Sequence, residues 1–162
     1  MDDLVKRDGL YYKKFTHVPF TGKTTGRKQV SFKNGKKHGL WVVYYRDGQL
    51  SEKGTYKNGK KDGLWVDYSW DNGQLGSKGQ YIDGKRDGLW ETYHDNGQLQ
   101  TKGYYKDGKK DGLWEYFHEN GQLFSKGHLK DGKRDGLWEY FNEDGTVWER
   151  ITGTYKNGEK IK

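Results

Sequence analysis

The sequence has no cysteine, no alanine, a single proline and no long run of apolar residues. Without cysteine there is no disulfide, no thiol nucleophile and no thiolate metal site, whatever the redox compartment. Without alanine, and with 25 glycines and no 3.6-residue periodicity, the chain is not expected to form helices. No segment approaches the roughly 18 apolar residues of a transmembrane helix. No apolar stretch follows Met1 to indicate a signal peptide, so a cytoplasmic location is the default expectation. A secreted or cell-envelope location remains the alternative if a leader was trimmed.

Hydrophobic residues are also scarce, at 30%, and the mean hydropathy is −1.26. These values alone would indicate disorder. Aromatic residues, however, make up 16% of the chain, and a few aromatic side chains can bury much surface. The formal charge of +7 favours acidic partners, nucleic acid or anionic membranes, and says nothing about the fold.

A unit of 24 or 25 residues recurs along the chain, and each copy opens with Gly-Leu-Trp. The tryptophans are Trp41, Trp65, Trp90, Trp114 and Trp138. Repeats of this length are typical of arrays, in which each copy buries its apolar face against the next. We predict copies at 39–62, 63–87, 88–111, 112–135 and 136–162, after a degenerate N-terminal repeat or cap at 1–38. Together they form one continuous repeat domain.

Each copy contains two β-prone runs separated by Asn-Gly or Asp-Gly. These dipeptides are the strongest short-range hairpin signal, because their turns require positive φ. The turns therefore alternate between two edges. The predicted fold is all-β: an elongated array of about five to six tandem antiparallel β-hairpins in a single twisted sheet. Gly112 is placed at a turn, where Gly112→Val is expected to cost about 1 kcal/mol or more.

An aromatic residue follows each tryptophan by three positions. The predicted core combines the tryptophans with these aromatics, namely Tyr44, Tyr68, Tyr93, Phe117 and Phe141, and with the leucine before each tryptophan. In a regular strand the tryptophan and the later aromatic point to opposite faces. Either the strand is bulged or both faces are partly covered.

The pattern Gly-x-Trp-x-x-Tyr-x-x-Asn-Gly-Gln-Leu-x-x-Lys-Gly-x-Tyr-Lys-x-Gly-Lys-x-Asp-Gly resembles the bacterial variant of the MORN repeat (membrane occupation and recognition nexus). The resemblance covers about residues 9–160. It implies antiparallel hairpins in an elongated array, a binding role and no shared catalytic residues. Arrays of this kind often carry the label of YwqK-type antitoxins, so an antitoxin or adaptor role is a looser implication.

Basic residues recur at the turns that link the hairpins, and we predict that they form one row along one edge. The candidates are Lys36, Lys37, Lys60, Lys61, Lys85, Arg86, Lys109, Lys110, Lys133 and Arg134. The row could bind anionic lipid headgroups or a nucleic-acid backbone. Alternatively, it keeps the turns soluble and protects the sheet edge, with neighbouring aspartates such as Asp111 neutralising part of its charge.

Aromatic residues that vary between copies, or break the pattern, are candidates for protein binding. They are Tyr45, Trp70, Tyr104, Tyr116, Phe124, Tyr140 and Trp148, with Trp70, Tyr116 and Trp148 taken as the principal ones. Partial burial against neighbouring copies is the alternative interpretation. A third hypothesis is a cell-surface sugar or choline site built from aromatic hairpins.

No catalytic, cofactor or metal site is predicted. His94 and His118 occupy equivalent positions in neighbouring copies, too far apart to share one metal ion. The leading hypothesis is a non-catalytic scaffold that binds a protein partner, with anionic lipid or nucleic acid and sugar or choline as alternatives. The open ends of the array leave end-to-end association as a further prediction.

Overall fold

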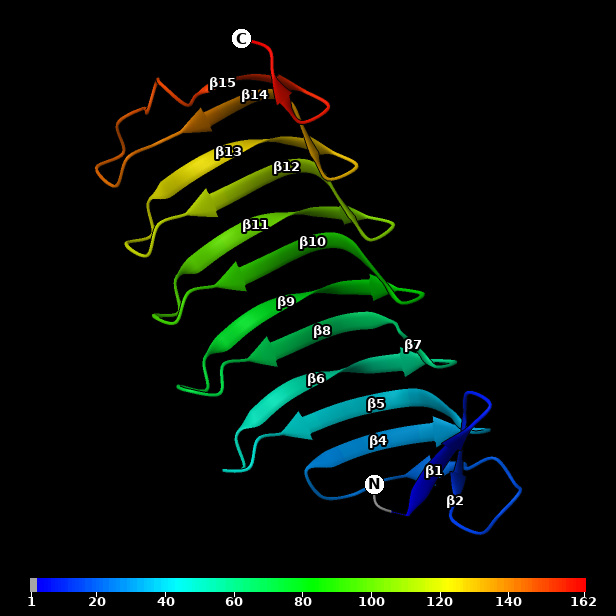
Figure 1. Cartoon of the computed structure of the whole chain (residues 1–162). Helices are drawn as coiled ribbons and strands as arrows, with labels where there is room; N and C mark the ends of the chain where they lie inside the picture. The colour runs from blue at the N-terminus through cyan, green and yellow to red at the C-terminus, as the bar shows by residue number, and fades with distance from the viewer. Residues whose placement is uncertain (1–2) are drawn as a thin grey trace.

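The computed structural model describes residues 3–162, which form β-strands joined by turns and loops without any helix (Figure 1). A long sheet holds fourteen strands, and a separate hairpin holds two. All pairings are antiparallel, and the chain ends lie at opposite ends of the array. The all-β array of tandem antiparallel hairpins in one sheet is therefore confirmed. The separate hairpin consists of β1 (Leu4–Arg7) and β2 (Leu10–Lys13).

The strands of the long sheet follow one another in chain order, apart from the short β7, which pairs with β6. Their bounds are β3 (Gly22–Lys23), β4 (Lys28–Lys33), β5 (Lys36–Tyr44), β6 (Leu50–Lys57), β7 (Lys60–Lys61), β8 (Gly63–Tyr68), β9 (Leu75–Ile82), β10 (Lys85–Tyr93), β11 (Leu99–Lys106), β12 (Lys109–Phe117), β13 (Leu123–Lys130), β14 (Lys133–Tyr140), β15 (Gly153–Lys156) and β16 (Glu159–Lys160).

The two edges of the sheet carry different kinds of turn. At one edge, called the turn edge, both residues of each Asn-Gly or Asp-Gly pair have positive φ, for example Asp107 at 52° and Gly108 at 87°. This is the two-residue type I′ turn, whose twist matches that of the strands. At the opposite loop edge only the glycine has positive φ, as in the loop before Gln98. There the His94 N–H donates to the Gln98 carbonyl, which closes a three-residue loop.

The glycine that opens each copy lies inside a strand, not at a turn. Gly112 has a φ of 87° within β12, where residues 111–113 stand opposite Tyr104 alone. The positive φ produces a bulge, which keeps Lys110 and Trp114 on the same face of the strand. Placing Gly112 at a turn was therefore wrong, although its backbone does require positive φ.

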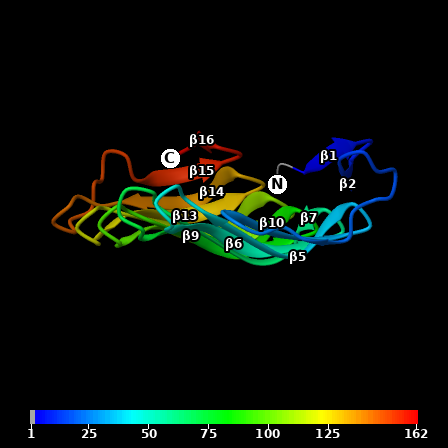
Figure 2. The same ribbon diagram turned by 90° about the horizontal axis from the view of Figure 1, so that it is seen from below.

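The sheet is a single curved layer, and the β1–β2 and β15–β16 hairpins lie on the same side of it (Figure 2). We call the side that bears the five repeat tryptophans the tryptophan face, and the opposite side the leucine face. Trp65, Trp90, Trp114 and Trp138 are 2–4% exposed. The leucines that precede the tryptophans, on the leucine face, are 37–58% exposed. The expectation that these leucines belong to the core is therefore wrong.

Both alternatives left open by the spacing of the aromatics occur. Register shifts mark bulges in four of the repeat hairpins, such as that between Tyr116 and Phe117. The aromatic three residues after each tryptophan lies on the leucine face and is only half-buried. Phe117 pairs there with Leu123, and the equivalent pairs form a second, shallower apolar strip. The residues concerned are Tyr44, Tyr68, Tyr93, Phe117 and Phe141.

Candidate binding face

The tryptophan face is built on contacts between four of the repeat indoles and a glycine of the preceding strand. A Cβ atom added to Gly103 would lie 2.3 Å from the ring of Trp114, so only glycine leaves room for the ring. The Trp114 Nε1 then donates to the Tyr104 carbonyl at 3.0 Å. Trp65, Trp90 and Trp138 repeat this arrangement over Gly54, Gly79 and Gly127.

Tyrosines separate successive tryptophans along this face. Tyr105 lies between Trp90 and Trp114, with ring centroids 6.0 and 5.3 Å away in edge-on geometry. Tyr56 and Tyr81 occupy the equivalent places in earlier copies. Edge-to-face pairs of this kind stabilise beyond simple area burial. The tryptophan face is therefore a continuous ladder of aromatic rings.

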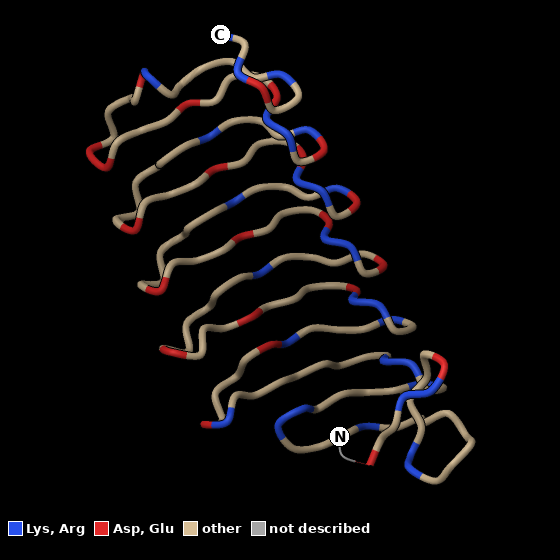
Figure 3. Tube along the Cα trace, in the orientation of Figure 1, with Lys and Arg blue, Asp and Glu red and all other residues tan. Residues whose placement is uncertain are grey.

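Cations cover the tryptophan rings. The second basic residue after each turn places its charge 3.7–4.9 Å from a tryptophan centroid, a cation–π distance. These residues are Lys37, Lys61, Arg86, Lys110 and Arg134. Their backbone lies along the turn edge beside that of their neighbours (Figure 3). Their side chains, however, lie over the tryptophan face, because each is four residues before a tryptophan and residues four apart in a strand share a face.

The first basic residue after each turn does lie at the turn edge, where Figure 3 shows Lys and Arg recurring from copy to copy. The residues are Lys36, Lys60, Lys85, Lys109 and Lys133. Lys60 and Lys109 form ion pairs with Asp83 and Asp131 of the next turn, at 2.7 and 2.9 Å. Lys85 and Asp107 lie 3.5 Å apart in the same arrangement. These pairs neutralise the middle of the row.

The loop edge is tied together by side chains that reach the next copy. His94 Nε2 lies 2.9 Å from the Phe117 carbonyl, and His118 Nε2 lies 3.1 Å from that of Phe141. Asn96 Nδ2 donates to the Glu119 carbonyl at 2.7 Å. Each copy thus fixes the loop of its neighbour. Among residues 3–162, no three His, Asp or Glu side chains gather where they could hold a metal ion.

The pattern-breaking aromatics do not form one cluster. Trp70 and Trp148, 67% and 43% exposed, lie in loop-edge segments three copies apart. Tyr104, 51% exposed, lies on the leucine face. The Tyr45 hydroxyl donates to the Tyr68 carbonyl of the next copy at 2.6 Å. Only Tyr116, Phe124 and Tyr140 come together.

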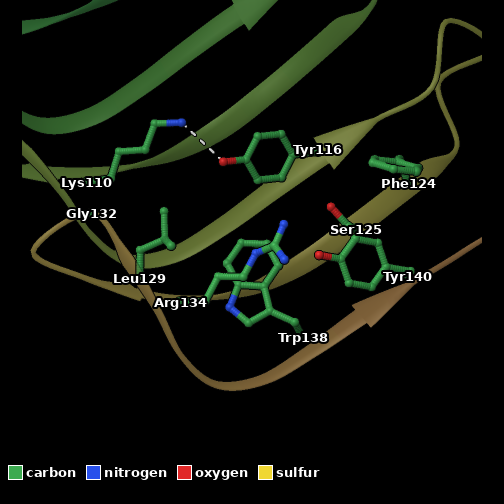
Figure 4. Close-up of a pocket in the computed structure, with 9 residues that line it drawn as sticks. All are labelled: Lys110, Tyr116, Phe124, Ser125, Leu129, Gly132, Arg134, Trp138 and Tyr140. Carbon is green, nitrogen blue, oxygen red and sulfur yellow. Dashed lines mark hydrogen bonds between the residues drawn. The ribbon is translucent and has the colours of Figure 1, made fainter. Parts of the chain in front are cut away.

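Those three side chains line a groove of about 330 Å³ on the tryptophan face (Figure 4). Its remaining lining residues are Lys110, Ser125, Leu129, Gly132, Arg134 and Trp138. Leu129 takes the place that Tyr56, Tyr81 and Tyr105 hold in the other copies. The ring between Trp114 and Trp138 is instead that of Tyr116, with centroids 6.1 and 6.2 Å from theirs. The smaller side chain opens the groove there, and Ser125 lies at its base with only 2% exposure.

The groove carries two cations without a carboxylate. Lys110 Nζ donates to the Tyr116 hydroxyl at 3.1 Å, and the Arg134 guanidinium lies 4.9 Å from the Trp138 centroid. Within the described part of the chain, neither cation forms an ion pair. The groove therefore combines aromatic and aliphatic walls with uncompensated positive charge.

In one earlier copy, the cation equivalent to Arg134 is paired with a carboxylate of the chain itself. Glu52 accepts a hydrogen bond from Trp41 Nε1 at 2.7 Å and pairs with Lys61 at 2.8 Å. Burial lowers the pKa of Lys37, and the Glu52 charge opposes that shift. Burial, with a contribution from Glu52, also raises the pKa of Tyr56 to about 12. Counting from the strand glycine, Glu52 and Lys61 correspond to Ser125 and Arg134.

Sequence reasoning missed Glu52, Ser125 and Leu129. Their signal lay in comparing equivalent positions. Leucine replaces a tyrosine present in the other copies, and one copy has glutamate where the next three have serine or threonine. None of these residues belongs to a recognisable chemical motif, so only the assembled face reveals their relation.

Comparison with protein-family models finds a match to one described as MORN repeat variant, over residues 37–58, 86–107, 110–131 and 134–157. The unmatched stretch 59–85 holds the copy with the extra loop residue around Trp70. A comparison with curated proteins finds no match. No helix in residues 3–162 is long and apolar enough to cross a membrane.

Proposed function

Since this chain belongs to the MORN repeat variant family, whose repeats are generally non-catalytic binding modules, we propose that it is a scaffold that binds a protein partner along its tryptophan face. The observation that carries the proposal is the groove around Leu129. The departures from the repeat at Tyr116, Phe124, Leu129 and Tyr140 all gather there. Variation that converges on one place is how a repeat array gains specificity.

The chemistry of the groove suits a protein partner. Interface centres are enriched in aromatic residues and arginine. The aromatic side chains combine large contact area with few rotatable bonds. Tyr116, Trp138, Tyr140 and Arg134 supply these types in one patch. An adaptor or antitoxin would use the same kind of surface, and either role would fit this proposal.

The other two hypotheses have less support from the geometry. For anionic lipid or nucleic acid, the middle lysines of the turn edge are already paired with aspartates. For choline, the places over the tryptophan rings are already taken by the chain's own cations, such as Lys61 at 3.7 Å from the Trp65 centroid. A ligand cation would have to displace them.

The test is a pull-down from a lysate of the source cell at low and at high salt, with mass spectrometry of the retained material. Two variants adopt the residue of the preceding copy: Tyr116→Thr, as at Thr92, alters the groove, and Tyr104→Gln, as at Gln80, alters the leucine face. We expect one stoichiometric protein, retained at high salt by the native chain and by Tyr104→Gln, and lost by Tyr116→Thr. Retention of nucleic acid or lipid alone, lost as salt rises, would contradict the proposal.

A further inference from the structure

The groove around Leu129 has the features of a site for a carboxylate flanked by an apolar side chain. It offers a floor of Ser125 and Leu129, walls of Tyr116, Phe124 and Tyr140, and the cations Lys110 and Arg134 (Figure 4). We propose that it binds an acidic peptide segment, with a Glu or Asp carboxylate held by Arg134 and Lys110 and the adjacent apolar side chain in the space beside Leu129. This inference rests on the proposed function and specifies the chemistry of the partner.

An earlier copy of the array already makes, within the chain, the carboxylate contact proposed for the ligand. In the copy that begins at Gly39, the Glu52 carboxylate lies beside Lys61 and Trp41. At the corresponding position the groove has Ser125, whose short side chain leaves the carboxylate site empty beside Arg134. A carboxylate from outside would restore the pair that the earlier copy makes internally. The indole N–H would not take part, because Trp114, the counterpart of Trp41, already donates its Nε1–H to the Tyr104 carbonyl at 3.0 Å.

The apolar half of the ligand follows from the tyrosine ladder. In earlier copies a tyrosine fills the gap between neighbouring tryptophans, and edge-on ring contacts hold it there. In this copy Leu129 takes the tyrosine's position and Tyr116 contacts both tryptophans from the neighbouring strand. The groove beside Leu129 keeps aromatic walls, which favour an apolar or aromatic neighbour. A leucine or phenylalanine side chain of the partner would bury apolar surface there without displacing any hydrogen bond of the chain.

The charge pattern favours a peptide over a phosphate backbone. Charge-driven binding of nucleic acid depends on many cation–phosphate contacts in a row. The groove offers two cations, and the neighbouring lysines of the turn edge are largely paired with aspartates. A single carboxylate held by an arginine at an apolar wall matches this limited charge.

A second pocket of about 270 Å³ lies one copy earlier and has equivalent lining residues, including Arg86, Thr101, Tyr105 and Lys110. Two strands separate the pockets, a distance of about 10 Å, and an extended peptide advances about 3.3 Å per residue. A segment running along the array would therefore present acidic residues about three positions apart. Tyr105 narrows the second pocket, so the one around Leu129 is the principal anchor.

The probe is a fluorescein-labelled peptide, Gly-Ser-Glu-Leu-Gly-Glu-Leu-Gly-Ser, titrated into the native protein and followed by fluorescence anisotropy. Two variants take residues that the array itself uses at the equivalent positions, so both are expected to fold. Ser125→Glu supplies the internal carboxylate of Glu52, and Leu129→Tyr restores the tyrosine. Gln80→Glu makes the same charge change on the leucine face, where Gln80 is exposed, and serves as the matched control.

We expect Ser125→Glu and Leu129→Tyr each to weaken peptide binding about tenfold, the loss of one charge-assisted contact or one apolar anchor. Gln80→Glu should leave the affinity unchanged, and replacing both glutamates of the peptide by glutamine should weaken binding to the native protein. Equal binding of the glutamine peptide, or unchanged binding by both groove variants, would overturn the inference. Binding to phosphatidylglycerol vesicles, which have phosphate but no carboxylate, would also overturn it if that binding were stronger than binding to the peptide and were abolished by Ser125→Glu.

The lysate experiment separates the two proposals. If the native partner is lost by Tyr116→Thr but kept by Ser125→Glu, the tryptophan face binds a protein without the carboxylate contact, and only the further inference fails. If no protein depends on Tyr116, the proposed function fails, whatever the peptide does.

Discussion

The glycine beneath each indole is required for its lack of a side chain. Gly103 has no positive φ, yet a Cβ there would lie 2.3 Å from Trp114. We expect Gly103→Ala to lower the free energy of unfolding by about 1–3 kcal/mol, because the ring must leave its place against the strand. Urea denaturation followed by tryptophan fluorescence measures this. An unchanged midpoint would mean that the indole can shift at no cost.

Substitution of the glycine in the bulge destabilises the fold for a different reason. Gly112 has space around it, since the nearest atom to an added Cβ is 3.9 Å away, but its φ is 87°. Gly112→Val is expected to cost about 1 kcal/mol or more through backbone strain alone. In the same denaturation experiment the fluorescence of the folded state should stay native, unlike that of Gly103→Ala. A native-like stability would show that the bulge can relax without positive φ.

Ionised Glu91 stabilises the fold, and we expect this contribution to the free energy of unfolding to be lost in acid. Its carboxylate pairs with Lys78 at 2.7 Å and accepts a hydrogen bond from Tyr93, and the Lys78 ammonium holds the pKa of Glu91 below its usual 4.5. A depressed carboxyl pKa stabilises the fold above pH 4.5, and this contribution is lost as the pH falls through the lower folded-state value. Because Lys78 is partly exposed, we expect only about 0.5–1 kcal/mol.

The measurement is the urea midpoint of native protein and Glu91→Gln as a function of pH. The two curves should differ near neutral pH and converge in acid. Glu115, the equivalent residue of the next copy, forms no ion pair among the described residues, so Glu115→Gln is the control and should follow the native curve. Parallel curves for Glu91→Gln would show that the Lys78 pair adds nothing to stability.

At the scale of the hairpin, the dipeptide turns could be predicted and the bulges could not. Asn-Gly and Asp-Gly specify positive φ by themselves, so the alternation of the two edges followed from the sequence. The bulge at Gly112 depends on pairing with strands on both sides, which no local signal contains. Lys110 and Trp114 are four residues apart and share a face, so the lysine lies over the indole while Lys109 points away from it.

The copy 63–87 tests how far the loop edge tolerates change. Its loop closes between Ser69 and Gln74, one residue longer than the loop between His94 and Gln98, and the added segment exposes Trp70. Deleting Trp70 should restore a three-residue loop and change the free energy of unfolding by no more than about 0.5 kcal/mol. The emission maximum should move to the blue as the most exposed tryptophan disappears. A large fall in the urea midpoint would mean that the longer loop supports the array.

At the scale of the whole molecule, the sequence predicted an array but not its binding groove. Copies recognisable by their shared residues define the ladder, whereas the groove arises where Leu129, Tyr116 and Phe124 differ from their counterparts. These three residues come from two neighbouring strands. Their convergence depends on strand register, which a one-dimensional comparison of copies does not supply.

The two ends of the array are both covered on the tryptophan face. Tyr11 of β2 and Phe20 pack on Phe32 of β4, with ring centroids 5.0 and 5.6 Å away. At the other end, the place that a further tryptophan would take over Gly153 is occupied by Lys160. We infer that both ends act as caps, in keeping with the N-terminal cap predicted at 1–38. The outermost strands, β3 and β16, are only two residues long, and such short edge strands oppose end-to-end association.

At the turn edge, aspartates neutralise part of the lysine charge along the length of the molecule. Lys60, Lys85 and Lys109 each face an aspartate of the next turn, whereas Lys36 and Lys133 face Asn58 and Asn157 at the equivalent positions. The triple change of Asp83, Asp107 and Asp131 to asparagine should therefore fold, because Asn58 and Asn157 adopt the same positive φ. It frees three lysines along one edge and raises the formal charge by three.

Each lysine near an anionic membrane contributes about 1 kcal/mol to binding. The variant should therefore bind phosphatidylserine vesicles at least about tenfold more tightly than the native protein, with the gain lost at high salt. Co-sedimentation with the vesicles measures this, and neutral phosphatidylcholine vesicles are the control. Strong binding of the native protein to these vesicles, unchanged in the variant, would contradict the prediction. It would support binding to anionic membranes as the function, because the aspartates would then not limit that binding.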